Sequence, residues 1–120
     1  MLFNLNEFLL SVSFALDFIE MDFIGVPTNH GKRVAYMALR LSEKLKLSEE
    51  EKYDLVSISI LHDNGIAEVY SREKLYSNGI GELKSNEDIK DHCIIGENNA
   101  KPYPFFTDTT NVIKYHHEKY

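Results

Sequence analysis

The sequence contains a single cysteine, Cys93, among its 120 residues. One cysteine cannot form an internal disulfide, which excludes the class of small secreted domains that disulfides hold together. Cys93 lies between Ile89 and Ile94, and we interpret it as a small core residue. We therefore expect a cytoplasmic protein.

Long apolar runs are also missing. The N-terminal stretch Met1–Val26 is rich in apolar residues but contains Glu7, Asp17, Glu20 and Asp22. It has no basic segment of the kind that precedes the apolar run of a signal peptide, and no uninterrupted run that would span a bilayer. We therefore expect a core helix here, and no membrane partner.

Basic residues are scarce relative to acidic ones. Lys and Arg number 13 and Asp and Glu number 19, so that the formal net charge is −6. Proteins that bind DNA or RNA concentrate positive charge, so we expect no nucleic-acid partner. A small phosphorylated substrate held by metal ions is still compatible with this charge. The hydrophobic content of 43% and charged content of 27% are those of a globular chain of one domain.

Helical periodicity runs through the chain, and we expect an all-α fold. Capping boxes at Asn4 with Glu7 and at Ser48 with Glu51 predict two helix starts, and Asn64-Gly65 predicts a helix end. The first three expected helices cover residues 4–21, 28–45 and 48–64. A helical fragment at 67–76 and a loop around 78–81 follow the third helix. A fourth helix is expected from residue 85 or 86 to before Pro102, and a last one from residue 108 or 109. In the second helix, the expected core face is Val34, Met37, Ala38, Leu41 and Leu45.

All five histidines lie on or beside these predicted apolar faces. His62-Asp63 closes a helix end that faces the core, and both side chains are costly to bury unless something binds them. Neutral imidazole and ionised carboxylate are common ligands of zinc, iron and manganese. Three alternatives stay open: His62 as a hydrogen-bonded residue of a capped helix end, His30 as a capping or packing residue, and His116-His117 as a polar surface pair.

Metal sites in helical proteins are built from side chains on facing helices. The histidines occur here in the order His30, His62-Asp63, His92 and His116-His117. The surrounding motifs are His30-Gly31-Lys32-Arg33-Val34-Ala35, Leu61-His62-Asp63-Asn64-Gly65, Ile89-Lys90-Asp91-His92 with Gly96, and His116-His117-Glu118. With these motifs, the sequence resembles the HD-GYP family of the HD phosphohydrolase superfamily over essentially its whole length.

The resemblance implies an HD-domain-like bundle of about five core helices and a centre of up to two divalent metal ions. Iron or manganese is expected, with zinc or nickel as alternatives. Asp63 would bridge the two ions, one of which would also bind His30 and His62. The other ion would also bind His92, His116 and His117. The implied reaction is hydrolysis of the signalling molecule cyclic di-GMP by a metal-activated water, with Asp63 and His62 as the catalytic residues.

Three departures from the family pattern bear on activity. The family usually has a phosphate-holding Lys after the Gly of its His-Asp motif, where this chain has Ile66. Some relatives have a Glu four residues before the first His, which supports a third metal; here it is Val26. The Gly-Tyr-Pro loop and a later Asp ligand would follow Tyr120. We therefore interpret residues 1–120 as a single HD-GYP-like domain that is truncated at its C-terminus and is catalytically weak or inactive.

Two other interpretations of the histidine pattern are open. The chain is alternatively a degenerate HD domain that binds metal or nucleotide as a regulatory module, or a helical bundle whose histidines are only packed. The expected ligand is a cyclic dinucleotide or another small phosphoester. We also expect a homodimer held partly by the last helix, through exposed apolar residues at Val112, Ile113, Tyr115 and Phe105-Phe106.

Overall fold

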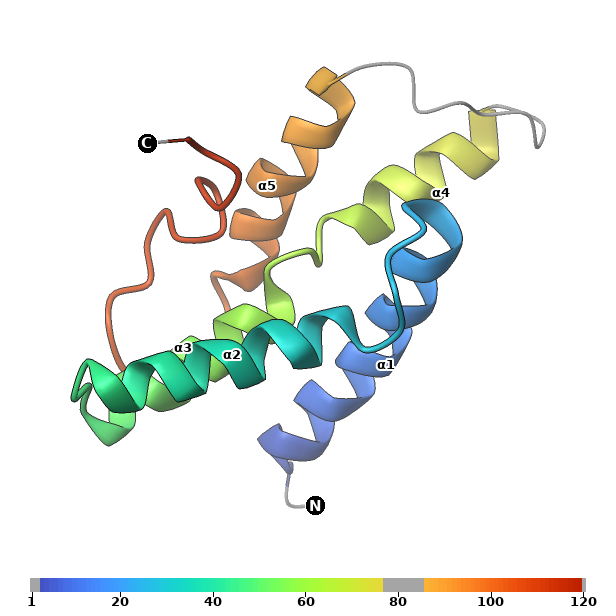
Figure 1. Ribbon diagram of the computed structural model, residues 1–120. Coiled ribbons are helices and arrows are strands. Elements are labelled where there is room, and N and C mark those ends of the chain that lie inside the picture. Colours follow the sequence, from blue (N-terminus) through green and yellow to red (C-terminus); the bar gives the residue numbers. More distant parts are fainter. Residues whose placement is uncertain (1–2, 77–85, 120) are drawn as a thin grey trace.

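The computed structural model describes residues 3–76 and 86–119 of the chain. All regular structure in these residues is helical (Figure 1). The predicted all-α fold is therefore confirmed. The helices are α1 (Leu5–Phe23), α2 (His30–Lys44), α3 (Glu49–Leu61), α4 (Ile66–Tyr76) and α5 (Asn86–Ala100). The loop expected around residues 78–81 lies outside the described residues.

Local capping signals position the starts of α1 and α3. Asn4 Oδ1 accepts a hydrogen bond from the Glu7 amide at 3.1 Å, which caps α1. At α3, Ser48 Oγ accepts from the Glu51 amide at 3.2 Å, while the Glu51 carboxylate accepts from the Ser48 amide at 2.7 Å. This reciprocal pair is the predicted capping box, and both predicted helix starts are confirmed.

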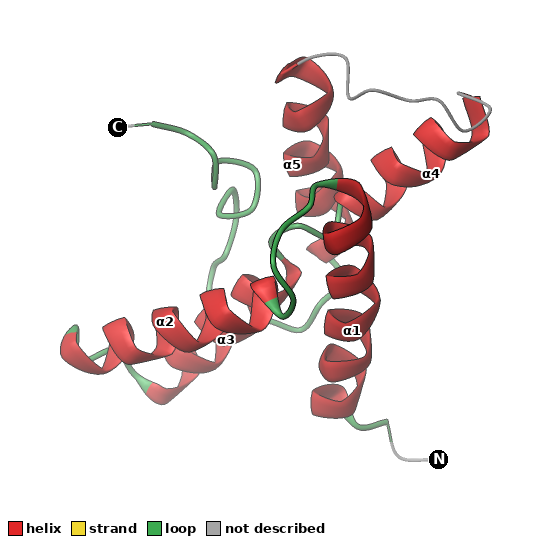
Figure 2. Ribbon diagram, turned by 45° about the vertical axis from the view of Figure 1, so that its right-hand side comes forward, coloured by secondary structure: helices red, strands yellow, loops and turns green. Residues whose placement is uncertain are grey.

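Helices α2 and α3 lie side by side in both views (Figures 1 and 2), and their contact corrects one prediction. The buried residues of α2 are Ala35 and Ser42, while Met37, Leu41 and Leu45 are 61%, 58% and 62% exposed. Three of the five residues that we expected to face the core are therefore exposed, while Val34 and Ala38 are half-buried. The small side chains allow close packing, and Ser42 Oγ is satisfied by donating to the Leu39 carbonyl at 2.6 Å.

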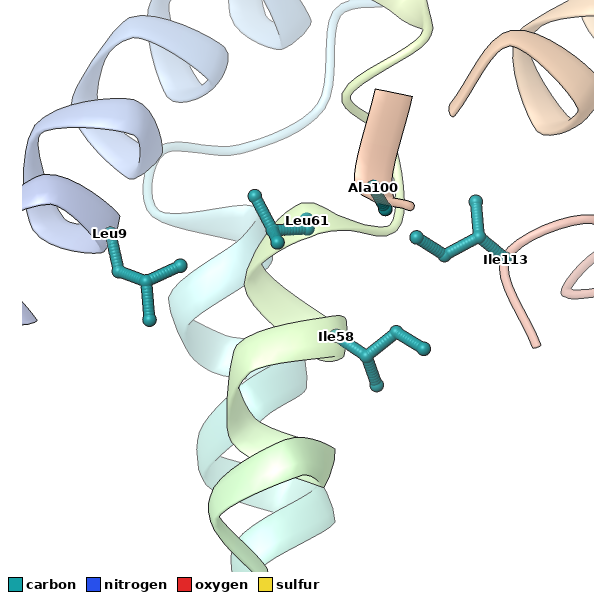
Figure 3. Packing of buried hydrophobic residues seen from close by; sticks show 5 residues of the cluster. All are labelled: Leu9, Ile58, Leu61, Ala100 and Ile113. Carbon is teal, nitrogen blue, oxygen red and sulfur yellow. The ribbon is translucent and has the colours of Figure 1, made fainter. Parts of the chain in front are cut away.

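A small apolar core joins segments that are far apart in the sequence. Figure 3 shows Leu9 of α1, Ile58 and Leu61 of α3, Ala100 of α5 and Ile113 packed around one centre. Ile113 is only 1% exposed, so its expected place on an exposed dimer surface is wrong. Tyr103 and Phe105 pack against this core and are partly buried.

The segment after α5 is held by side chains of α3 and α5. The buried Asp54 carboxylate accepts hydrogen bonds from the Phe106 amide at 3.0 Å and from the Thr107 amide and hydroxyl, each at 2.6 Å. The Glu97 carboxylate accepts from the Asn111 amide at 2.6 Å and the Lys114 amide at 3.1 Å. These contacts explain how the chain runs down to α3 and returns beside α5 (Figure 1).

The last predicted helix is wrong. Residues 110–117 form consecutive turns instead. Asn111 has a left-handed φ of 68°, which a continuing α-helix does not allow, and its amide donates to Glu97. The Glu97 carboxylate thus accepts from two amides of this segment, and the remaining bonds of the segment are backbone bonds within its turns. The two adjacent histidines that follow are therefore placed by turns.

Among the described residues, none of the helices combines the length and the apolar character needed to cross a membrane. Helix α1 is the longest, at 19 residues, and it carries three acidic side chains after Glu7. One of them, Glu20, is only 2% exposed and belongs to the buried face of the helix.

Candidate metal centre

A tight turn after α3 places Asp63. The Asn64 amide donates to the Leu61 carbonyl at 3.0 Å, and the Ile66 amide donates to the Asp63 carbonyl at 2.9 Å, which starts α4. At Gly65 the backbone of this turn lies directly against the backbone of α5. A Cβ added at Gly65 would lie only 2.0 Å from the His92 carbonyl oxygen. The Asn64 side chain also donates to the Gly96 carbonyl at 3.0 Å. The close crossing brings the His-Asp turn against the helix that carries His92.

The two carboxylate oxygens of Asp63 face different histidines. Oδ2 lies 2.8 Å from Nε2 of His62 and 3.6 Å from Nε2 of His30. Oδ1 lies 3.3 Å from Nε2 of both His92 and His116. One buried carboxylate thus joins histidines from α2, the end of α3, α5 and the C-terminal segment.

Two of these rings are oriented by backbone carbonyls. His62 Nδ1 lies 2.7 Å from the Ser59 carbonyl oxygen, and His116 Nδ1 lies 2.6 Å from the Ile113 carbonyl oxygen. A carbonyl oxygen only accepts hydrogen bonds, so Nδ1 carries the proton in both rings. In a neutral ring, Nε2 then presents a lone pair towards a carboxylate oxygen. Such an arrangement is favourable only with a cation between the two groups or with a protonated ring.

Burial, hydrogen bonds and the charge of Asp63 shift the pKa values of several side chains in this cluster. Burial opposes ionisation of Asp63, but hydrogen bonds from His116, His62 and His92 hold its pKa far below the usual range. Burial alone would lower the pKa of His62, yet its hydrogen bond to Asp63 and the charge of that carboxylate raise it overall. Burial lowers the pKa of His30 and of His117.

The donor atoms form two groups with the dimensions of metal sites. His30, His62 and Asp63 make one group, and His92, Cys93, His116 and His117 make the other; within each group the ligand atoms lie within 4.8 Å of one another. Two nitrogens bound tetrahedrally to one zinc ion are roughly 3.3 Å apart, and the His92 and His116 Nε2 atoms are 3.4 Å apart. The side chains present therefore fit a pair of divalent metal ions joined by Asp63.

All six predicted ligands are brought together. His92 is 2% exposed and Asp63 4% exposed. His117 is exposed, and its ring centroid lies 4.1 Å from that of His116 and 5.1 Å from that of His92. His116 and His117 are therefore not a free surface pair. His30 is likewise not an isolated packing residue.

Comparison with known proteins identifies the fold family around this cluster. The family model described as "HD domain" matches residues 28–120, which include all six predicted ligands. The chain belongs to the HD domain family. The His62-Asp63 pair lies within the matched residues.

A curated relative extends the comparison. The chain is 29% identical over 114 residues to the 3'3'-cGAMP-specific phosphodiesterase 1 of Vibrio cholerae serotype O1. The match covers 95% of this chain and 24% of that protein, so the chain spans about a quarter of the length of its relative. No solved structure shows a significant match to the chain.

A cavity opens beside the first donor group of the HD domain. Its volume is about 280 Å³, and His30, His62, Asp63, His92 and His117 form its polar wall. The apolar wall consists of Phe23, Ile24, Val26, Ile66 and Val69. The candidate ligands are thus accessible from a cavity that is otherwise apolar.

Two residues near the centre were missed as site residues by sequence reasoning. Cys93 was interpreted as a core residue, and it is buried, but its Sγ lies 3.7 Å from His92 Nε2. Glu20 was used only to exclude a membrane helix. Its Oε2 has no hydrogen-bond partner among the described residues. Burial, and next the charge of Asp63, raise its pKa to about 7.

A sequence signal for Glu20 was present. The buried face of α1 consists of Leu9, Ser13, Leu16 and Glu20, which recur at helical spacing. A carboxylate on such a face requires a compensating partner or neutralisation. No comparable signal existed for Cys93, because a cysteine that packs and a cysteine that binds metal look the same in an apolar helix.

Proposed function

We propose that this HD domain is a metal-dependent phosphohydrolase of the HD-GYP type whose substrate is a cyclic dinucleotide, cyclic di-GMP in the first place. The observation that carries the proposal is the division of the Asp63 carboxylate between two groups of histidines. The similarity to a protein named as a 3'3'-cGAMP-specific phosphodiesterase supports the same class of substrate.

Up to two divalent ions fit the proposed centre, iron or manganese by resemblance and zinc or nickel as alternatives. His30, His62 and Asp63 would hold one ion, and Asp63, His92, His116 and His117 the other. When bound, such ions supply positive charge for a phosphate group and make water acidic enough to attack phosphorus.

The chain's own residues have three tasks in this proposal. Asp63 remains ionised because its pKa is held far below the usual range, so its carboxylate would be available to both ions at any physiological pH. The carbonyls of Ser59 and Ile113 fix the His62 and His116 rings with Nε2 directed inward. The apolar cavity wall keeps bulk water away from the reacting phosphate.

The size of the cavity limits what it encloses. At about 280 Å³ it is small among ligand sites. It has room for one phosphate with part of its sugar, and the rest of a cyclic dinucleotide would extend over the outer surface.

A specific observation favours the second candidate, a catalytically weak module that binds metal or nucleotide. Ile66, at the place of the phosphate-holding lysine of the family, is 5% exposed and lines the cavity. Two other cations of the chain, Lys32 and Arg72, are engaged elsewhere. Lys32 Nζ lies 3.1 Å from Asn29 Oδ1, and Arg72 pairs with Glu68.

Metal-dependent turnover tests the proposal. The purified chain, loaded with iron(II) or manganese(II), would be assayed with cyclic di-GMP, 3'3'-cGAMP and bis(p-nitrophenyl) phosphate. Asp63→Asn should abolish any turnover, while the exposed Asp108→Asn serves as the matched control. Metal binding without turnover of any substrate would favour the second candidate. A chain that binds neither metal nor nucleotide would exclude both.

We further propose that residues 1–120 form one domain of a cytoplasmic protein and that the domain associates as a homodimer. The dimer surface consists of Phe106, Val112 and Tyr115, which are 60%, 49% and 51% exposed. Sedimentation equilibrium at micromolar concentration tests this proposal. A single species of 13.9 kDa that binds no hydrophobic dye would contradict it.

A further inference from the structure

The second donor group contains a residue that has no part in the proposed function as stated so far. Cys93 follows His92 on α5 and is 4% exposed. Its Sγ and the nitrogens of His92, His116 and His117 lie within 4.8 Å of one another. Four potential ligands thus converge on one point, and three of them are histidines.

The distances match those of a sulfur-containing metal site. A zinc ion bound tetrahedrally by sulfur and nitrogen places these two atoms roughly 3.6 Å apart. The Cys93 Sγ and His92 Nε2 atoms are 3.7 Å apart. The Nε2 atoms of His92 and His116 are 3.4 Å apart. Two of the distances between donor atoms therefore have the lengths that a bound ion requires.

A path for an ion to this group is also present. A cavity of about 420 Å³, separate from the one beside His30, is lined by Cys93, His117 and Tyr115. Cys93 is only 4% exposed, yet it is one of the residues that line this space. An ion can therefore reach the second group without passing the first.

We propose that Cys93 is a thiolate ligand of the ion held by His92, His116 and His117. This proposal rests on the metal centre of the proposed function and names a ligand beyond those that the family resemblance implies. On binding, the S–H bond breaks, its proton leaves to solvent, and sulfur donates an electron pair to the ion. No change of oxidation state is involved.

The sulfur ligand gives the two halves of the centre different properties. Thiolate and imidazole together favour zinc or iron(II) over manganese and magnesium. Three histidines, Cys93 and the shared Asp63 leave little room for a further ligand, so this ion is held tightly. The group of His30, His62 and Asp63 has fewer donors and retains open positions for substrate oxygen.

Cobalt(II) provides a test that does not depend on activity. A cobalt–thiolate bond absorbs strongly in the near-ultraviolet, and histidine or carboxylate ligands alone do not produce this band. Titration of the metal-free chain with cobalt(II) should produce it. Cys93→Ala, which keeps a small apolar residue at the site, should lose the band, and its zinc affinity should fall by at least about tenfold.

Controls separate the possible outcomes. Circular dichroism shows whether Cys93→Ala keeps the helical fold, and Cys93→Ser tests the same contact with an oxygen. Cobalt binding without the near-ultraviolet band, or with equal zinc affinity in wild type and Cys93→Ala, would overturn the thiolate proposal and leave the histidine centre intact. A chain that binds neither cobalt nor zinc would overturn the metal centre itself.

Discussion

Nε2 of His62 lies 2.8 Å from Oδ2 of Asp63, the residue that follows it in the chain. The other ring nitrogen donates to the Ser59 carbonyl, so the contact with Asp63 requires a proton or a metal ion at Nε2. In the metal-free chain a proton fills this role, because the Asp63 carboxylate raises the pKa of His62. A metal ion must displace that proton.

Metal affinity at the His30 group should therefore rise with pH. The raised pKa of His62 means that its ion pair with Asp63 is fully formed below the unfolded value of about 6.5 and is lost as pH rises through the folded value. Zinc competes with the proton over this range. Isothermal titration from pH 6 to pH 9 should show affinity increasing and proton release decreasing. A pH-independent affinity would show that His62 is not a ligand.

His92→Ala should reduce metal content more than His30→Ala. His92 is 2% exposed and belongs to the group with more donors, whereas the His30 side chain is 29% exposed. An ion at the second group would thus be the more tightly held, and its loss would dominate the measured stoichiometry. Elemental analysis of protein purified without chelator measures both variants. Equal loss in the two variants would indicate a single shared ion.

Glu20→Gln should stabilise the metal-free chain at high pH. The pKa of Glu20 is raised from 4.5 to about 7 by burial and by Asp63. The folded state therefore binds the proton more tightly than the unfolded state, and wild-type stability falls as pH rises from 4.5 through 7. At pH 8 the variant should gain up to about 3 kcal/mol in the free energy of unfolding. At pH 4 the difference should vanish, and urea titrations at the two pH values measure it.

Gly65→Ala should disrupt the crossing of the His-Asp turn with α5. The added Cβ would lie 2.0 Å from the His92 carbonyl oxygen and 2.8 Å from the Gly96 amide nitrogen. We expect a loss of about 3 kcal/mol or more, because two backbones have to separate. Gly31→Ala is the matched control, since its Cβ would meet no heavy atom closer than 3.5 Å. Thermal unfolding compares them, and equal midpoints would contradict the close crossing.

Ile66→Lys should raise phosphodiesterase turnover if the proposed function holds. Ile66 is buried in the cavity wall beside Asp63, where a cation would meet the scissile phosphate. Preorganised charge at such a position commonly changes rates by about a hundredfold. Ile66→Met, similar in size and without charge, is the control. A lysine variant no faster than the methionine variant would mean that charge at this place does not limit the reaction.

Short-range features of this fold follow from the sequence, and contacts between distant segments do not. The caps at Asn4 and Ser48 were predictable because each involves residues three apart. The inward face of α2 was not, because its buried residues, Ala35 and Ser42, are small and carry little hydrophobic signal. The turns that replace the last helix depend on Glu97, a side chain 14 residues away from Asn111.

The candidate site was likewise predictable from the sequence only in part. The grouping of the six candidate ligands was predictable because histidine at apolar faces is unusual and their order resembles a known family. Their partition between the two Asp63 oxygens required the structure. Cys93 entered the site only through its three-dimensional surroundings, whereas Glu20 could have been found from its place on the buried face of α1.

The three hydrogen bonds that Asp54 accepts from Phe106 and Thr107 also imply an order of events during folding. They close a loop of 53 residues between α3 and the C-terminal segment. Closing so long a loop costs entropy that local helix formation does not. His116 and His117 lie beyond this closure, so we expect the second donor group to be completed after α3 and α5 have formed. We expect added zinc to leave the early rate of refolding unchanged and to slow unfolding instead.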